Sequence, residues 1–233
     1  MKKLLVAFLI LLLPNLSFAA ISVGNAASGK NGSGSSLSYS MTVSGLTAAL
    51  IVTVFGPTTD LCPSTVSWNG NTLNQLGKVT GNRWEYVYGG IVGGGTGNVS
   101  FNCTGSDSVV SYAQEYDAVL AMTNTGGAST QTNTATSITM GTTTLADGSW
   151  VLMSARNPSQ AISAGSNTTL RYASTTDTNF ALLDEGPVSP AGSVNIAATA
   201  GASVNWQGIL VILTPSASSG LSSITQLLRS FFL

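Results

Sequence analysis

The residues of this chain whose type and spacing could support catalysis are five carboxylates: Glu85, Glu115, Asp117, Asp184 and Glu185. Two acids held about 5–10 Å apart can hydrolyse a glycosidic bond, one as the acid and the other as nucleophile or base. Glu85, however, falls on the strand face opposite Trp84 and Tyr86, and the other four carboxylates flank the ends of expected strands, where solvated charges are common. A glycan-acting hydrolase using paired carboxylates therefore stays an alternative function.

Other catalytic chemistry finds little support. The chain has no histidine, so the usual serine and cysteine triads lack their base. No serine stands in a Gly-x-Ser-x-Gly pattern, and no Lys-Ser or Lys-Thr follows the glycines between Gly89 and Gly97 as a phosphate loop would require. Two cysteines without histidine cannot complete a zinc site, and the acids near Asp60, Asp107 and Asp177 lack the alternating spacing of a calcium loop. We expect a protein that is not an enzyme, with no catalytic residue, no cofactor and no metal ion.

The tryptophans could bind sugars, because an exposed indole stacks on a sugar ring. Trp150 and Trp206 each lead into an apolar strand, so they are expected to cover the core. Trp68 stands beside Asn69-Gly70 and is expected to be the most exposed of the four. Trp68 and Asn69 are therefore the predicted ligand-binding residues.

The N-terminus has the pattern of a secretory signal peptide. Lys2 and Lys3 precede an apolar run from Leu4 to Leu13, and small residues follow around Ala19. The run is too short for a membrane-spanning helix, which needs about 20 apolar residues. We predict a signal peptide at residues 1–19 and a secreted or cell-surface protein that begins at Ala20, with no transmembrane span in the mature chain.

Export decides how the two cysteines are interpreted. In an oxidising compartment Cys62 and Cys103 predict one disulfide, and two buried free thiols are the alternative. The same export leaves a weakly charged protein, since six Lys and Arg remain against nine Asp and Glu. Such a chain has no basic surface for nucleic acid.

Short β-branched and aromatic segments bounded by Gly, Asn, Asp or Pro recur along the chain. Leu37–Val43 alternates apolar and hydroxyl side chains, as a half-buried antiparallel strand does. Asn69-Gly70 predicts a type I′ hairpin turn. We predict one all-β domain at residues 20–215, an antiparallel β-sandwich with jelly-roll topology or, alternatively, an immunoglobulin-like Greek key. Ala26–Ser36 and Thr123–Ala135 are expected to be long loops.

Residues 216–233 form a linker and a tail. Apolar residues recur in the tail at three- and four-residue steps, which predicts a short C-terminal amphipathic helix: Leu221, Ile224, Leu227, Leu228, Phe231 and Phe232. The helix could dock on its own domain, contact a partner or a second copy, or rest on a membrane surface.

Four motifs, in this order, carry a resemblance: Val66-Ser67-Trp68-Asn69-Gly70-Asn71-Thr72-Leu73, Val110-Ser111-Tyr112, Gly148-Ser149-Trp150-Val151, and Asn205-Trp206 running into Ile209–Pro215. Over residues 37–215 the chain resembles a recurrent, functionally uncharacterised β-sandwich module of bacterial exported and phage-associated proteins. In that module a Thr-Gly turn usually follows Ser-Tyr, whereas Ala113-Gln114-Glu115-Tyr116 continues the strand here. The resemblance implies no activity and no site residue.

Together these patterns predict a secreted, non-enzymatic surface module for binding, adhesion or extracellular assembly. Its expected partners are a glycan or a cell-surface protein, and the tail could form a homo-oligomer. Besides the hydrolase, a purely structural subunit of an extracellular layer or fibre remains an alternative.

Overall fold

A computed structural model describes residues 19–32, 36–56, 65–80, 84–103, 108–174 and 179–216, with the backbone alone for residues 124–134. These residues form two antiparallel sheets, one of them nearly closed, and contain no helix. The all-β prediction is therefore confirmed. The predicted signal peptide, apart from Ala19, and the predicted C-terminal helix lie outside the described residues.

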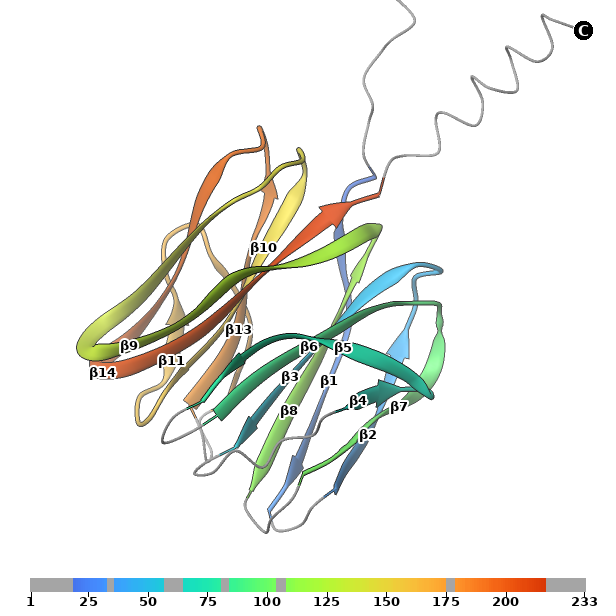
Figure 1. Ribbon diagram of the computed structural model, residues 1–233, viewed down its shortest axis with the longest axis horizontal. Helices are drawn as coiled ribbons and strands as arrows, with labels where there is room; N and C mark the ends of the chain where they lie inside the picture. The colour runs from blue at the N-terminus through green and yellow to red at the C-terminus, as the bar shows by residue number, and fades with distance from the viewer. Residues whose placement is uncertain are drawn as a thin grey trace, which may run out of the picture.

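The first sheet takes its strands from the first half of the chain (Figure 1): β1 Ser22–Asn31, β2 Ser36–Val43, β3 Ala48–Gly56, β4 Val66–Trp68, β5 Asn71–Val79, β6 Trp84–Val92, β7 Gly95–Asn102 and β8 Val109–Asp117. Its strand order is β1-β8-β3-β6-β5-β4-β7-β2. The two end strands, β1 and β2, lie beside each other, so the sheet curves almost into a barrel. We call the line where β1 meets β2 the seam.

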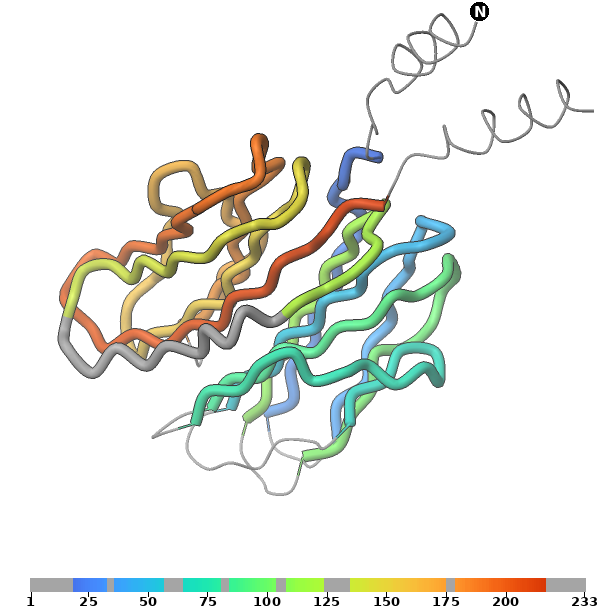
Figure 2. Tube along the Cα trace, turned by 45° about the horizontal axis from the view of Figure 1, so that its top comes forward, coloured from blue at the N-terminus to red at the C-terminus, as the bar shows by residue number. Residues whose placement is uncertain are grey.

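The second sheet follows: β9 Val119–Thr143, β10 Ser149–Asn157, β11 Ile162–Ala164, β12 Thr169–Ser174, β13 Asn179–Val188 and β14 Ser193–Pro215. Its order is β11-β14-β10-β13-β12, and β9 pairs with β14. β14 is so long that its first part pairs with β11 and its last part with β10. The β9–β14 pair curves across the molecule beside the first sheet (Figure 2). The predicted domain boundaries, residues 20 and 215, enclose both sheets.

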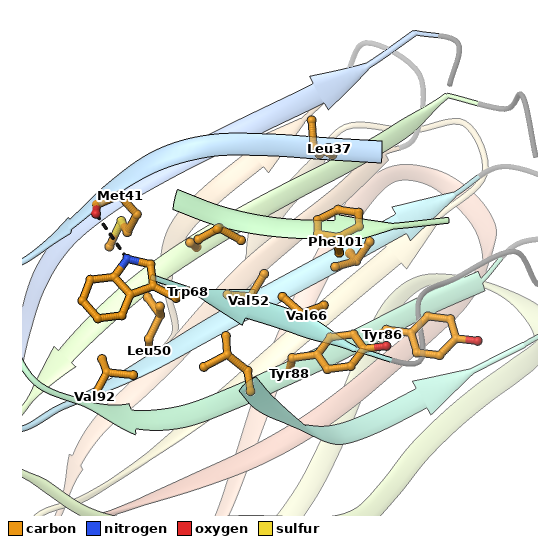
Figure 3. Packing of buried hydrophobic residues seen from close by; sticks show 14 of the residues in the cluster. Leu37, Met41, Leu50, Val52, Val66, Trp68, Tyr86, Tyr88, Val92 and Phe101 are labelled. Atoms are coloured by element: carbon orange, nitrogen blue, oxygen red, sulfur yellow. Dashed lines mark hydrogen bonds between the residues drawn. The ribbon is translucent and has the colours of Figure 1, made fainter. Parts of the chain in front are cut away.

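Buried side chains form three clusters. One fills the inside of the first sheet (Figure 3), one lies between the two sheets, and one is confined to the second sheet. β10 separates the last two, because successive side chains point to opposite faces of a strand. Trp150 and Leu152 face the first sheet, while Val151 and Met153 face the other way. All nine residues of β10 are consequently buried.

The hairpin predicted at Asn69-Gly70 is confirmed. Asn69 and Gly70 both have positive φ, 47° and 79°, as a type I′ turn requires, and Trp68 pairs with Asn71 across it. The turn also pairs with a neighbouring strand, since the Asn69 amide donates to the Asn98 carbonyl at 3.1 Å.

Substituting Gly70 by alanine should lower the free energy of unfolding by about 1 kcal/mol, because a Cβ disfavours positive φ. Space is not the cause, since no atom lies within 4 Å of the site such a Cβ would take. Gly192→Ala is the matched control: its Cβ would also be free within 4 Å, but its φ is not in the positive region. Urea unfolding of both variants measures the difference, and equal losses would contradict this account.

Two predicted loops are wrong. Ala26–Asn31 belongs to β1, and Thr123–Ala135 lies within β9. β1 is half-exposed along its length and runs at the edge of the sheet, so its sequence needs no apolar alternation. β9 is held in place by its long register with β14, from Val119↔Pro215 to Thr143↔Ser193. Backbone pairing with a neighbouring strand extends both β1 and β9.

The predicted disulfide is not shown. Cys103, at the end of β7, is 4% exposed, whereas Cys62 lies outside the described residues. Among the residues that are described there is no disulfide bond. The bond between Cys62 and Cys103 stays a prediction.

Candidate functional site

A patch of uncharged polar side chains covers the outside of β2, β4 and β7. Alternation along these strands buries Leu37, Met41, Val99 and Phe101 in the first cluster and leaves their neighbours outside. We call this patch the hydroxyl face, and it consists of Ser36, Ser38, Ser40, Thr42, Ser67, Thr96, Asn98, Ser100 and Asn102.

Strand register arranges the hydroxyl face in rows. Ser38 lies opposite Ser100, which lies opposite Ser67 on the next strand. The Ser67 and Ser100 hydroxyls are 3.1 Å apart, and those of Thr42 and Thr96 are 3.0 Å apart. Neighbouring strands in a sheet lie about 4.8 Å apart, so the rows present hydrogen-bonding groups at a regular spacing.

One end of the hydroxyl face is hollowed. A depression of about 360 Å³ is lined by Ser36, Leu37, Ser38, Thr65, Ser67, Ser100, Phe101 and Asn102. Leu37 and Phe101 lie opposite each other on adjacent strands and are 8% and 5% exposed. The depression is therefore lined mainly by residues with hydroxyl and amide groups, and none of the residues around it is charged.

The expectation that Trp68 is exposed is wrong. Trp68 is 2% exposed, belongs to the cluster inside the first sheet, and donates its indole N–H to the Met41 carbonyl at 3.2 Å (Figure 3). The hairpin turn is at the surface, but alternation points Trp68 inward with Val66. A buried indole cannot stack on a sugar. Asn69, the other predicted ligand-binding residue, is exposed at the turn, next to the hydroxyl face.

Three of the five candidate catalytic carboxylates are closed to solvent. Glu85 and Glu115 are fully buried and Asp184 is 1% exposed, while Asp117 and Glu185 are partly exposed. Asp184 and Glu185 are adjacent in β13 and so point to opposite faces. The structure brings together only Glu115 and Asp117, which share one face of β8.

Glu115 joins the two strands of the seam, a role that its sequence position did not suggest. Its carboxylate accepts hydrogen bonds from the Asn25 amide of β1 at 2.8 Å and, just beyond β2, from the Ser44 and Gly45 amides at 2.6 and 2.8 Å. A bulge in the β1–β8 register between Val23 and Ala26 turns Asn25 toward it. One side chain of β8 thus binds the backbone on both sides of the seam.

Two further contacts close the seam along its length. The Tyr39 hydroxyl of β2 lies 2.8 Å from the Ser111 hydroxyl of β8, and the Asn31 side-chain amide donates to the Ser36 carbonyl at 2.6 Å. Two glycines of β1, Gly24 and Gly29, leave space at the seam for the side chains of Glu115 and Tyr39. A Cβ at Gly24 would clash with the Glu115 carboxylate, and one at Gly29 would clash with the Tyr39 ring.

The pKa values of Glu115 and Asp117, which lie close together on β8, shift in opposite directions. Burial acts to raise the pKa of Glu115, but hydrogen bonds from Gly45, Asn25 and Ser44 together lower it. Burial and the neighbouring negative charge of Glu115 raise the pKa of Asp117. The Glu115 carboxylate is hydrogen-bonded to three backbone amides and stays ionised, so it is poorly suited to proton transfer.

A second buried carboxylate lies between the sheets. Glu85, on β6, is fully buried, and burial raises its pKa to about 7 although the Ser154 hydroxyl and the Arg156 charge oppose the shift. Arg156, on β10, is 1% exposed and donates to the carbonyls of Gly56 at 3.1 Å and Trp84 at 3.3 Å. Arg156 therefore joins the second sheet to the first.

Asp184 completes the polar contacts between the sheets. It accepts a hydrogen bond from the Tyr116 hydroxyl at 2.9 Å and pairs with Arg171 at 2.5 Å. Burial, followed by the charge of Asp184, raises the pKa of Tyr116. The Arg171 guanidinium lies 5.6 Å from the centre of the Trp150 ring. These side chains bind one another, so they stabilise the contact between the two sheets instead of facing a ligand.

No protein-family model matches this chain, and no curated protein matches it significantly. Among the described residues, no group of three or more His, Cys, Asp and Glu side chains could hold a metal ion. Over the same residues there is no helix long and apolar enough to cross a membrane.

Proposed function

We propose that this protein is an exported, non-enzymatic surface module and that its hydroxyl face binds a neutral glycan. The observation that carries the proposal is the uncharged depression of about 360 Å³ on that face. Pockets for small molecules span about 300–1,000 Å³, so the depression has room for one or two sugar units. The absence of charge along its lining favours a ligand that is itself uncharged.

The chemistry of the face suits this ligand. Sugar hydroxyls both donate and accept hydrogen bonds, as Ser and Thr hydroxyls and Asn amides do. Each such bond contributes only about 0.5–1.5 kcal/mol net, so a single sugar would bind weakly. The rows of hydroxyls that extend from Ser38 to Thr42 allow a longer chain to make several such contacts at once.

We also propose that the first sheet is a jelly roll. Its order divides into two sets of four strands, β1-β8-β3-β6 and β2-β7-β4-β5. In each set, strands from β1–β4 lie next to strands from β5–β8. Two Greek keys produce such an order, and lectin domains are among the proteins with this fold. That likeness is an analogy of fold and does not identify a ligand. Membership of the exported β-sandwich module family likewise stays a proposal.

The burial of Glu85, Glu115 and Asp184 favours the non-enzymatic proposal over a hydrolase. A glycosidase needs both of its acids at the substrate, whereas Glu115 and Asp184 are engaged with protein groups.

Substitution of Ser38 by glutamate tests the proposed site. The new charge would lie in the lining of the depression, whose residues are all uncharged, so binding to neutral polysaccharides should weaken about tenfold or more. Ser163→Glu is the matched control, since Ser163 is an exposed strand serine in the second sheet. Affinity electrophoresis on a panel of neutral polysaccharides measures the effect. Equal binding by both variants, or no binding by the parent protein to any polysaccharide of the panel, would refute the proposed site.

A further inference from the structure

Both ends of the described chain meet several loops at one end of the molecule, the upper end in Figure 1. The Ala19 amide donates to the Ser216 carbonyl at 2.9 Å, and the Ser216 amide donates to Ala118 at 2.8 Å. We call this the loop end. It comprises residues 44–47, 91–94, 117–120, 144–148 and 189–192 together with the two chain ends.

Contacts between its segments make the loop end continuous. Gly45 packs directly against Asp117, and the Leu46 carbonyl lies 3.8 Å from where a Cβ of Gly93 would be. On the other side of the chain ends, a Cβ at Gly148 would lie 3.7 Å from Pro215. The Thr144 amide donates to the Gly192 carbonyl at 2.9 Å. The loop end thus spans both sheets.

Four of the five large exposed apolar side chains among the described residues lie at the loop end. Leu145 is 94% exposed, Leu46 92%, Leu120 64% and Ile91 42%. The fifth, Leu170, is 37% exposed and lies in β12. An isolated exposed leucine is ordinary, but a group of them at one end marks an interaction surface.

The form of this surface fits a lipid bilayer. Leu46 and Leu145 are almost wholly exposed in the β2–β3 and β9–β10 connections, so they protrude instead of lining a groove. A protein partner needs a pocket that matches each protruding side chain, whereas lipid chains adapt to them. No Lys or Arg occurs in the segments of the loop end, so an uncharged, zwitterionic lipid surface fits better than an anionic one.

The sequence that continues from Ser216 supports the same partner. Seventeen residues follow it, and their apolar residues from Leu221 to Phe232 recur with helical spacing and only one cation, Arg229. An amphipathic segment of this kind lies in the plane of a membrane interface. The chain leaves the second sheet at the loop end, where Ser216 is hydrogen-bonded to Ala19 and Ala118.

We propose that the loop end faces a lipid bilayer, with Leu46 and Leu145 inserting between zwitterionic lipids. The proposal is independent of glycan binding by the hydroxyl face, which lies on the side of the first sheet. A module attached in this way would present its hydroxyl face laterally, away from the lipid.

Flotation of the full exported chain with phosphatidylcholine vesicles tests the proposal. The parent protein should float with the vesicles, and the double variant Leu46→Ser, Leu145→Ser should lower the bound fraction about fivefold or more, since two apolar side chains no longer leave water. Leu170→Ser is the matched control and should bind as the parent does. Absence of flotation by the parent, or equal binding by the double variant, would overturn the proposal.

A second measurement separates lipid contact from contact between copies of the chain. The fluorescence of the tryptophan introduced by Leu46→Trp or by Leu145→Trp should be quenched by brominated lipid, whereas that introduced by Leu170→Trp should not. Sizing of the parent protein without lipid provides the other arm. If it sediments as an oligomer that the double variant abolishes, and if bromine leaves the new tryptophans unquenched, the loop end is a contact between copies and the proposal fails.

Discussion

Replacing Glu115 by alanine should lower the free energy of unfolding by about 3 kcal/mol, because three backbone amides, one in β1 and two just beyond β2, lose a charged acceptor. The strands concerned are the two ends of the first sheet, β1 and β2. The Glu115 carboxylate binds both Asn25 of β1 and Gly45 beyond β2. The substitution should therefore loosen the seam before it affects the rest of the sheet.

The loss should also depend on pH. The pKa of Glu115 is lower in the folded protein than its usual value, so its contribution is present above that usual value and is lost as the pH falls through the folded pKa. Glu115→Gln removes the charge but keeps one acceptor oxygen. We expect the stability difference between the parent protein and Glu115→Gln to be largest near pH 7 and to shrink toward pH 3.

Urea unfolding between pH 3 and 7 measures this difference, and hydrogen exchange at Asn25 and Gly45 locates it. Asp117→Asn is the control on the same face of β8. The pKa of Asp117 is raised by burial and by Glu115, so removing its charge relieves a repulsion near pH 7 and should not destabilise the fold. A difference between parent and Glu115→Gln that stays constant with pH would contradict the role given to the Glu115 carboxylate.

Local sequence patterns predicted those parts of the fold that local physics controls. Alternation along Leu37–Val43 predicted which side chains face inward, and Asn69-Gly70 predicted the turn between β4 and β5. These signals work because each depends on residues that are close in sequence.

Long-range pairing escaped prediction. β1 has a polar sequence and becomes a strand because β8, far along the chain, supplies its backbone pairing partners, from Ser22↔Asp117 to Asn31↔Val109. Trp68 was expected at the surface because it is next to a turn, yet its indole packs in the cluster inside the first sheet. The alternating serines of β2 indicate part of the hydroxyl face. That β7 lies next to β2 and completes this face follows only from the strand register.

Polar residues that join the two sheets were also missed, since a lone charge in a strand looks like a solvent-exposed residue. Arg156 follows Met153, Ser154 and Ala155 in β10 with nothing in the sequence to show that both faces of this strand are buried. Glu85 on β6 is likewise a single charged residue in a strand, and its burial is not indicated by its neighbours in the sequence. Only the approach of the second sheet makes these two groups neighbours.

Substituting Arg156 by methionine should cost about 3–5 kcal/mol at pH 8, because it leaves a buried carboxylate without its positive charge. Arg156 also donates to the carbonyls of Gly56 and Trp84, so these acceptors lose a bond between the sheets. Methionine keeps much of the length of the side chain and fills the space, so the loss should reflect charge and hydrogen bonding more than a cavity.

The sign of the pH dependence follows from Glu85, whose pKa of about 7 is above its usual value. Such a group contributes stability below its usual pKa and loses that contribution as the pH rises through about 7. In Arg156→Met the burial of Glu85 is no longer opposed by a positive charge, so its pKa should rise further. The variant should therefore be much less destabilised at pH 5, where Glu85 is protonated, than at pH 8.

Thermal and urea unfolding of four proteins isolates the pair: the parent, Glu85→Gln, Arg156→Met and the double variant. Glu85→Gln should remove most of the stability loss that the parent shows between pH 5 and 8. The double variant should recover part of what Arg156→Met loses at pH 8, because no buried charge then remains. If Arg156→Met is destabilised equally at pH 5 and pH 8, the two side chains are not coupled, and Arg156 joins the sheets through the Gly56 and Trp84 carbonyls alone.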